Sequence, residues 1–389
     1  MSRNSLRRRT AILGGVSLAL FLSACGSSSP SSATGSTASA SAVSASGIAA
    51  AKQLVNQYEN PATSIGITSP LTGAPPKNKV VAWLAGNLSD ISTITTGFKQ
   101  ATSALGWKLL VIPYDITNLT SISAAMTQAV EQGANYIAIS GEPTTTWGTA
   151  YAMVKSKKIP VFESFTADTA EGASNDVYVN IGGNQFEDLL GKLVSAYNTV
   201  YWKGHPNILY VTDESYPVLD QLQQASQSAL KQFCPSCQFN VLNISNTQLA
   251  QGTTPQQVVS YIESHRDVNT IQFAFGEMST GTASALKSAG LDKNLIIDGS
   301  DPQQPNLTSL SSGAEQMWVG EPTTLSAFYQ VDAMARLALG MGVSPELSGL
   351  MPTQIITAQN VAHPAPSVYV PFSNAVQQFE QLWKVPVSG

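Results

Sequence analysis

Polar and aromatic residues recur directly after short apolar runs of this chain, where they could contact a small molecule. Asp213 follows the apolar run 207–212, and Glu277 closely follows the run 270–275. Carboxylate and amide groups can hydrogen-bond hydroxyl groups, and aromatic rings can lie against an apolar ligand face. The candidate binding residues chosen by this pattern are Asn87, Asp90, Asp115, Trp147, Phe165, Asp213, Tyr216, Glu277, Asp301 and Glu321.

Some of these candidates also have a purely structural explanation. Asp115 and Asp301 precede predicted helices, so either carboxylate could simply cap the helix that follows it. Trp147 could be a core residue at the first turn of its helix. Asp213 and Glu277 are the stronger candidates, because both follow strongly apolar runs and neither has a basic neighbour in the sequence.

Motifs for catalysis and for nucleotide binding are absent from the sequence. It contains no Gly-x-Gly-x-x-Gly, Walker, Gly-x-Ser-x-Gly or His-Glu-x-x-His pattern. Neighbouring carboxylates such as Asp298 and Asp301 could do acid–base chemistry, but they lie where predicted strands end. The three histidines are scattered, without metal-ligand spacing. We therefore expect a protein that is not an enzyme and that holds no metal and no cofactor.

Cys234 and Cys237, in Cys-Pro-Ser-Cys, allow three interpretations. A structural disulfide at a turn between a helix and a strand is favoured if the protein is exported. A redox-active pair lacks a thioredoxin-like context. Half of a zinc site lacks a second pair of ligands nearby.

The N-terminus has the pattern of an export signal. Basic residues (Arg3 and 7–9) precede a short apolar run over 11–22, and residues 22–25 read Leu-Ser-Ala-Cys. This ending resembles the bacterial lipobox, which implies cleavage after residue 24 and lipidation of Cys25. The alternative is an ordinary secretory signal with a chance cysteine. Residues 26–47 are almost entirely Ser, Ala, Gly and Thr, which predicts a flexible tether.

The charge of the chain argues against binding to nucleic acid. The sequence has 20 basic and 25 acidic residues, and the signal holds four arginines and no acids. Without the signal the balance is 16 against 25, or −9. Nucleic-acid binding requires a basic surface. No later apolar run is long enough to span a membrane.

Strand-like and helical patterns alternate from residue 79 onward. The first set has strands near 80–84, 107–112, 136–140 and 161–163, separated by helices. A second set begins at 177–181 and ends near 353–356. This alternation predicts an α/β protein with two doubly wound parallel-sheet lobes. In such sheets ligands bind beyond the carboxyl ends of the strands, which is where the candidate residues lie.

Three segments resemble one protein family. They are Phe98, Ala101, Leu105 and 106–107 with a strand ending near Asp115; Gln-Gly-Ala-Asn-Tyr-Ile-Ala-Ile at 132–139; and Ile-Ile-Asp-Gly-Ser-Asp at 296–301. From about 79 to 356 the chain is similar to the ribose-binding-like, sugar-binding branch of the type I periplasmic binding fold. Together with the signal, it resembles the solute-binding lipoproteins of bacterial ABC importers.

The resemblance implies two lobes that close over a ligand and are joined by a three-crossing hinge. The crossings are expected at Gly182, Gly183, Gly320 and Pro352, and glycine can absorb the backbone change of closure. The expected organisation is a signal peptide (1–24), a lipidated tether with a short helix (25–60), an extension (61–78), lobe 1 (79–183 plus 321–351), and lobe 2 with the C-terminal tail (184–320 plus 352–389).

The chain departs from the ribose-binding pattern by lacking arginines. Ribose binders of the family place an Asp-Arg pair where this sequence has Phe165-Thr166, and another arginine in the region that here reads 216–220. Only Arg266 and Arg336 follow the signal. Arginine commonly holds anionic ligands, so a neutral sugar or polyol, or a cation, is expected. A lysine or a helix N-terminus could still hold an anion.

The leading hypothesis is a binding protein for a neutral sugar or polyol that serves an ABC permease. We expect a monomer, anchored by lipid to the cell membrane on its extracytoplasmic side, without a nucleic-acid partner. The alternatives are a sensor of the same fold that presents a signal molecule to a membrane kinase, a structural or adhesive surface lipoprotein, and an enzyme.

Overall fold

The computed structural model describes residues 45–170, 177–343, 346 and 349–388. The predicted signal peptide (1–24), Cys25 and the tether up to residue 44 lie outside the described residues. A first helix, α1, already begins at Ala45 and ends at Tyr58. The predicted tether of 26–47 therefore overlaps the start of a helix.

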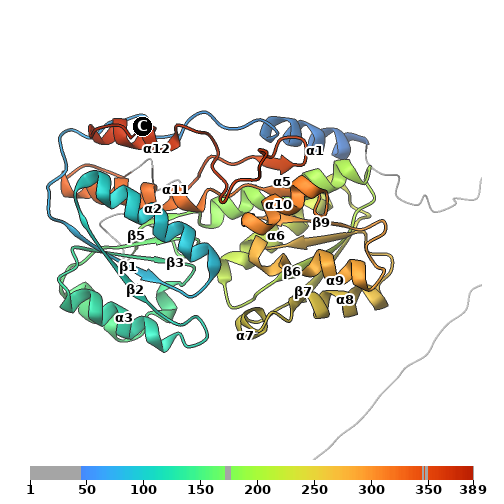
Figure 1. The fold of residues 1–389 in the computed structure, drawn as a ribbon, viewed down its shortest axis with the longest axis horizontal. Helices are drawn as coiled ribbons and strands as arrows, with labels where there is room; N and C mark the ends of the chain where they lie inside the picture. The colour runs from blue at the N-terminus through green and yellow to red at the C-terminus, as the bar shows by residue number, and fades with distance from the viewer. Residues whose placement is uncertain (1–44, 171–176, 344–345, 347–348, 389) are drawn as a thin grey trace, which may run out of the picture. The chain divides into compact units, whose positions relative to one another are not determined.

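Lobe 1 is built on a sheet of five parallel strands in the order β2-β1-β3-β4-β5. The strands are β1 (Val80–Ala85), β2 (Lys108–Pro113), β3 (Tyr136–Ser140), β4 (Val161–Ser164) and β5 (Val177–Ile181). Its helices are α2 (Ser89–Leu105), α3 (Thr120–Glu131), the 3-10 turn η1 (Thr144–Thr146), α4 (Ala150–Ser156) and α11 (Thr323–Ala338). Figure 1 shows this lobe on the left.

Alternation along β1 explains why helices cover both faces of this sheet. Val81 and Trp83 pack into one hydrophobic cluster with residues of α2 and α11. Ala82 and Leu84, which point to the opposite face, pack into a second cluster with residues of α3 and α4. A sheet covered on both faces needs apolar residues at consecutive positions, which is the pattern that predicted a parallel sheet.

Lobe 2 has a sheet of six strands in the order β11-β10-β9-β8-β6-β7. They are β6 (Asn207–Thr212), β7 (Gln238–Asn243), β8 (Thr270–Phe273), β9 (Ile296–Ser300), β10 (Met317–Val319) and β11 (Ile355–Thr357). Its helices are α5 (Asn184–Tyr201), α6 (Pro217–Phe233), α7 (Asn246–Ala250), α8 (Thr254–Ser264), the turn η3 (Gly276–Ser279), α9 (Thr282–Ser288) and α10 (Gln304–Ser312). All neighbours are parallel except β11, which runs antiparallel to β10. The predicted fold class is confirmed, with this one antiparallel strand added.

Three passes of the chain between the two sheets lie close together. They are residues 182–183 after β5, 320–322 after β10, and 349–354 before β11. The amide of Gly182 donates to the carbonyl of Gly349, and the amide of Gly320 donates to the carbonyl of Gln354. Gly182 has φ +72°, and a β-carbon there would lie 2.3 Å from the ring of Phe165, so this position requires glycine.

The terminal segments make two further passes between the lobes. Helix α1 packs on α5 and α6 of lobe 2. The extension after it runs along lobe 1, where the Tyr329 hydroxyl donates to the carbonyl of Ile65 and the amide of Leu71 donates to Leu382. At the other end, α12 (Ala375–Trp383) packs on α11 of lobe 1 (Figure 1). Within the range 352–389, which was predicted to belong with lobe 2, β11 lies in the sheet of lobe 2 and α12 packs on α11 of lobe 1.

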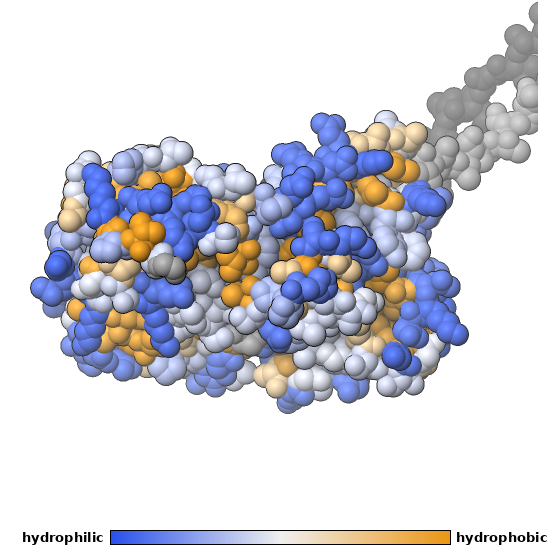
Figure 2. Space-filling view, turned by 45° about the horizontal axis from the view of Figure 1, so that its top comes forward, coloured by the Kyte–Doolittle hydropathy of each residue, from blue (hydrophilic) through white to orange (hydrophobic). Residues whose placement is uncertain are grey.

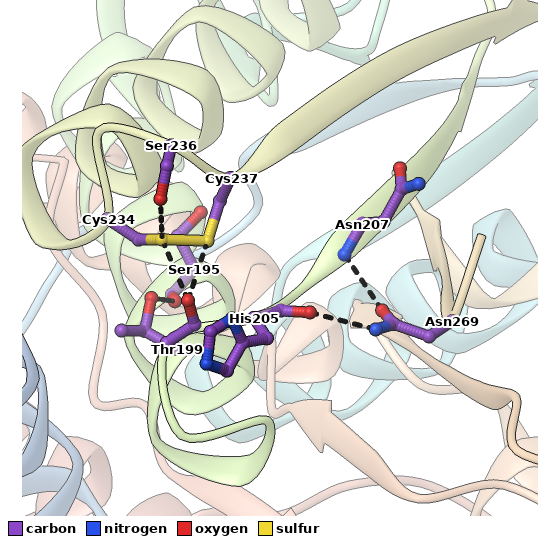
Figure 3. The surroundings of a disulfide bond; sticks show 9 residues. Ser195, Thr199, His205, Asn207, Cys234, Ser236, Cys237 and Asn269 are labelled. Atoms are coloured by element: carbon purple, nitrogen blue, oxygen red, sulfur yellow. Dashed lines mark hydrogen bonds between the residues drawn. A yellow bond between two sulfur atoms is a disulfide. The ribbon is translucent and has the colours of Figure 1, made fainter. Parts of the chain in front are cut away.

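Cys234 and Cys237 form a disulfide at the turn between α6 and β7 (Figure 3). Both sulfur atoms lie near the carbonyl oxygen of Gly204, at 3.1 and 3.3 Å. Beside this turn, the side chain of Asn269 donates to the carbonyl of His205 and accepts from the amide of Asn207. The two cysteines are therefore joined as a disulfide at the predicted turn between a helix and a strand.

The surface is mixed in character. Over the face in Figure 2, hydrophobic residues lie in separate patches among hydrophilic ones. Within the described ranges, no helix combines the length and apolar character needed to cross a membrane.

Arg336 is buried on α11, where it joins three segments. Its Nε lies 2.6 Å from the carboxylate of Asp332 and 2.8 Å from that of Glu346, and its Nη2 donates to the carbonyl of Ser69. Trp383 of α12 donates to the other oxygen of Asp332. This buried cluster ties the extension and the C-terminal helix to lobe 1.

Replacing Arg336 with methionine should lower the free energy of unfolding by about 3–5 kcal/mol, because Asp332 and Glu346 would remain buried without their cation. Urea denaturation of both proteins measures the difference. Arg266→Met is the matched control, since Arg266 is exposed and donates only to the carbonyl of Glu263 among the contacts of its side chain described here. The control should stay within about 0.5 kcal/mol of the parent. Equal effects of the two substitutions would contradict this assignment.

Candidate ligand-binding site

A pocket lies between the two lobes, at the carboxyl ends of strands from both sheets. Lobe 1 contributes Leu88, Asp90, Ile91, Tyr114, Ile116, Ser140, Gly141, Glu142 and Phe165. Lobe 2 contributes Glu187, Tyr216, Val218, Leu219, Ala274, Phe275 and Asp301, and Glu321 lies on the pass from β10 to α11. Parallel strands bring these loops together because all their carboxyl ends meet at the same edge of a sheet.

The lobes are in close approach at this pocket. A β-carbon at Gly141 of lobe 1 would lie 3.7 Å from the ring of Tyr216 of lobe 2. The cavity volume is about 80 Å³, counted as the volume that the centre of a water molecule can occupy. A single buried water needs roughly 10–15 Å³ by that measure, so the pocket has room for a small molecule.

Five of the residues predicted from the sequence line the pocket. Asp90 lies in the first turn of α2, Phe165 follows β4, and Tyr216 immediately precedes α6. Asp301 follows β9, and Glu321 follows β10.

Two more predicted residues lie next to the pocket without lining it. The negative charge of Asp213 acts on Glu142, and the negative charge of Glu277 acts on Asp90 and on Asp301. Asp213 Oδ1 accepts from the amide of Ser215, which fixes the turn before α6. These two carboxylates therefore shape the electrostatic field of the pocket from its border.

The remaining three predicted residues make structural contacts outside the pocket. Asn87 Oδ1 accepts from the amide of Ile116 at 3.0 Å, so it joins two loops. Asp115 accepts from both the amide and the hydroxyl of Thr117, which closes a turn before α3. Trp147 is fully buried, packs in the second cluster of lobe 1 and donates to the carbonyl of Glu142. None of the three lines the pocket, so the structure favours the packing explanation for Trp147 and a local turn for Asp115.

Four lining residues were not predicted, although their positions fit the strand-end pattern. Tyr114 and Glu142 each lie just after a strand, and Glu187 lies in the first turn of the helix after β5. Phe275 follows β8 in the same way. All four lie beyond strand ends, where ligands of such sheets bind. They were not among the candidates because other residues near the same strand ends were selected instead.

Two lining residues have unusual backbone conformations. Phe165 has φ +56° and Asp301 has φ +50°, a region that residues other than glycine rarely adopt. The carbonyl of Asp301 accepts from the amide of Gly276, and its Oδ2 accepts from the Gln303 side chain. The amide of Phe165 donates to the carbonyl of Ile181. These bonds hold the ring and the carboxylate at the pocket.

Burial raises the pKa of the lining carboxyl groups. Burial and the charge of Glu277 raise the pKa of Asp90 to about 7, and burial and the charge of Asp213 raise that of Glu142 to about 7. Burial and neighbouring carboxylates also raise the pKa values of Glu187, Asp301 and Glu321. In the part of the chain that the structure describes, no histidine, cysteine and carboxylate side chains are grouped in a way suited to hold a metal ion.

The raised pKa values predict that the ligand-free protein loses stability as the pH rises. Asp90 and Glu142 have ordinary values of 3.8 and 4.5 and values of about 7 when folded, so the folded protein binds more protons between these limits. The free energy of unfolding should fall between pH 5 and pH 8, by up to about 1.4 kcal/mol per pH unit for each of the two groups while the pH is below 7. Urea denaturation across this range measures it.

Glu142→Gln should make that pH dependence less steep by the contribution of one group, while the contribution of Asp90 remains. Asp115→Asn should leave it unchanged, because Asp115 is exposed and its hydrogen bonds to Thr117 lower its pKa. If the free energy of unfolding of the parent protein is constant from pH 5 to pH 8, the pKa values of the pocket carboxyl groups are not raised in the folded state.

Solved structures of binding proteins share this fold. A solute-binding protein of Agrobacterium vitis bound to α-D-tagatopyranose has a TM-score of 0.65 at 15% identity, covering 75% of this chain and 100% of its own. A carbohydrate transporter protein of Acidothermus cellulolyticus in complex with myo-inositol has a TM-score of 0.61 at 14% identity, covering 73% and 95%. The fructose-binding periplasmic domain of a hybrid two-component system has a TM-score of 0.60 at 16% identity, covering 73% and 91%. No curated protein matches the chain.

At these identities the structures establish the type I periplasmic binding fold and nothing finer. The family is shown by the sequence, because residues 80–341 match the model of the periplasmic binding protein domain. That match spans both sheets up to β10, the helix α11 and all the lining residues of the pocket. The chain therefore belongs to the periplasmic binding protein family.

Proposed function

We propose that this protein captures a small hydroxyl-bearing molecule of the sugar or polyol class and delivers it to an ABC importer in the membrane. The observation that carries the proposal is the pocket between the lobes, lined by carboxylates and aromatic rings from both sheets. Tyr114, Phe165 and Tyr216 offer flat faces for the apolar side of a ring. Carboxyl groups beside them can bond hydroxyl groups.

Relatives by fold support this class of ligand. The Agrobacterium and Acidothermus proteins hold a sugar and a cyclic polyol respectively. The domain from a two-component system binds fructose, and the same chemistry would serve the alternative in which this chain presents a signal molecule to a membrane kinase. Delivery to an importer is favoured here by the resemblance to solute-binding lipoproteins.

The proposal includes a lipid anchor on Cys25. The supporting observation is the order of basic residues, short apolar run and Leu-Ser-Ala-Cys at the start of the chain. An anchor with a tether would hold the binding domain on the extracytoplasmic side, close to its permease.

Thermal-shift measurements with sugars, polyols and amino sugars test the ligand class. A ligand at 100 times its dissociation constant should add about 2.7 kcal/mol of stability. Tyr216→Ala should weaken binding of the most effective compound by roughly tenfold or more, because a ring face is lost. Tyr201→Ala is the control, since Tyr201 lies on α5, is 40% exposed and does not line the pocket. A panel without any stabilising compound would contradict the proposed class.

Replacing Cys25 with serine should abolish lipidation and release the protein from the membrane fraction. Labelling of cells with a radioactive fatty acid, followed by fractionation, measures both effects. The Cys234→Ser and Cys237→Ser double variant is the control and should still be labelled. If the serine variant at position 25 stays labelled and membrane-bound, the anchor is not at Cys25.

A further inference from the structure

All charged side chains that line the pocket are acidic. Among the described lining residues there are five carboxylates and no lysine, arginine or histidine: Asp90, Glu142, Glu187, Asp301 and Glu321. Asp213 and Glu277 add negative charge at the border. Tyr114 and Tyr216 also face these carboxylates, and Asp188 and Tyr210 lie near Glu187. Enclosing so many like charges is costly unless protons or a partner of opposite sign neutralise them.

Several of these carboxylates have a buried oxygen without a hydrogen-bond partner in the described structure. They are Oδ1 of Asp90, Oε1 of Glu142 and Oδ1 of Asp301. Glu142 is only 2% exposed and Asp301 only 6%. A buried acceptor without a donor costs free energy, so these atoms are positioned to accept from a group that enters the pocket.

Some carboxylates that serve only the fold have donors for their oxygens. The carboxylate of Glu315 accepts from Trp318, Asn306 and Ser279. Asp332 accepts from Arg336 and from Trp383. Unpartnered carboxylate oxygens also occur inside the lobes, at Glu163 and Asp298. Those at the pocket differ in position, because they border a space that a ligand can enter.

The walls between the carboxylates are apolar, which suits an organic ion rather than a hydrated metal ion. Leu88, Ile91, Ile116, Val218 and Leu219 line the space. The rings of Tyr114, Phe165, Tyr216 and Phe275 complete it. A positively charged nitrogen is attracted both by carboxylates and by the faces of aromatic rings.

We propose that the ligand is a small organic cation, an amino sugar or amino polyol whose ammonium group pairs with the carboxylates of Glu142, Asp301 and Asp90. This inference rests on the proposed function and narrows its ligand class. An ammonium donates up to three hydrogen bonds and accepts none, which matches a pocket that presents free acceptors. Hydroxyl groups of the same ligand would bond the remaining carboxylates.

Matched pairs of compounds that differ in charge test the inference on the unmodified protein. The pairs are D-glucosamine with D-glucose, D-galactosamine with D-galactose, and N-methyl-D-glucamine with sorbitol, each at millimolar concentration in thermal-shift and calorimetric measurements. In at least one pair the amine should bind roughly 30-fold or more tightly than its neutral partner, as for a buried charge pair.

A fourth pair, 1,4-diaminobutane with 1,4-butanediol, separates the cation from the sugar class. If only the diamine binds, the cation inference stands and the sugar or polyol class falls. If a neutral sugar or polyol binds as tightly as its amine, the cation inference is overturned and the proposed function stands. If no compound of either kind binds, both are overturned.

Proton release gives a second and independent readout. A cation favours the ionised carboxylates, so binding near pH 7 should release protons, and affinity should weaken as the pH falls below 7. Calorimetry in two buffers of different ionisation enthalpy measures the release. A neutral ligand held by protonated carboxyl groups would release none, and that result would overturn the inference.

Glu142→Gln and Asp301→Asn keep the shape of the side chains and remove the charge. Each should weaken binding of the best amine by roughly 30-fold or more, while its neutral partner changes little. Asp115→Asn is the matched control outside the pocket and should leave affinity unchanged. Equal losses for the amine and for its neutral partner would show that these carboxylates act through shape or hydrogen bonding rather than charge.

Discussion

The structure depends on one geometric constraint, that parallel strands place all their carboxyl ends at one edge of a sheet. Both sheets here obey it, apart from β11, and their two edges meet at the pocket. Every loop that lines the site follows from this arrangement, because a strand that ends there must be followed by a turn into a helix. Side chains from distant parts of the sequence are thereby brought together without any long loop. The passes between the lobes at Gly182 and Gly320 lie at the same edge, so the pocket and these connections share one region of the fold.

The burial of acidic groups connects the fold to the chemistry. Buried carboxylates occur both at the pocket and inside the lobes, where Asp298 and Glu163 also have unpartnered oxygens. Glu315 and Asp332 receive donors from their own lobes, which makes them part of the scaffold. Glu142 and Asp301 keep an oxygen free at the interface of the lobes. These oxygens can accept a hydrogen bond from a group that enters the pocket.

The two lobes and the position of the pocket could be predicted from the sequence, because the pattern of apolar runs shows where strands end. The alternation of strands and helices predicted the two lobes, and the strand ends indicated the loops that line the pocket. The pattern could not say which side chain of a loop turns inward. Trp147 and Glu142 lie in one predicted loop, yet the indole is buried in lobe 1 and the carboxylate faces the pocket. Phe165 and Asp301 reach the site through positive φ angles, which no periodicity reveals. The packing of α12 on lobe 1 depends on contacts with Phe328 and Asp332 that are remote in sequence.

The extension after α1 and the segment before α12 affect how the lobes can move. With the extension after α1 and the segment before α12, five stretches of chain join the lobes instead of three. The carbonyl of Glu59, at the end of α1, accepts from the side chains of Gln354 and Asn360 beside β11, so the first added stretch is fastened to lobe 2 where it departs. Each added connection restricts the relative orientations that the lobes can sample before a ligand arrives. Less conformational freedom then remains to be lost on binding, and preorganisation of this kind raises affinity without new contacts. A receptor with so small a cavity gains from it, because a small ligand offers few atoms with which to close the lobes.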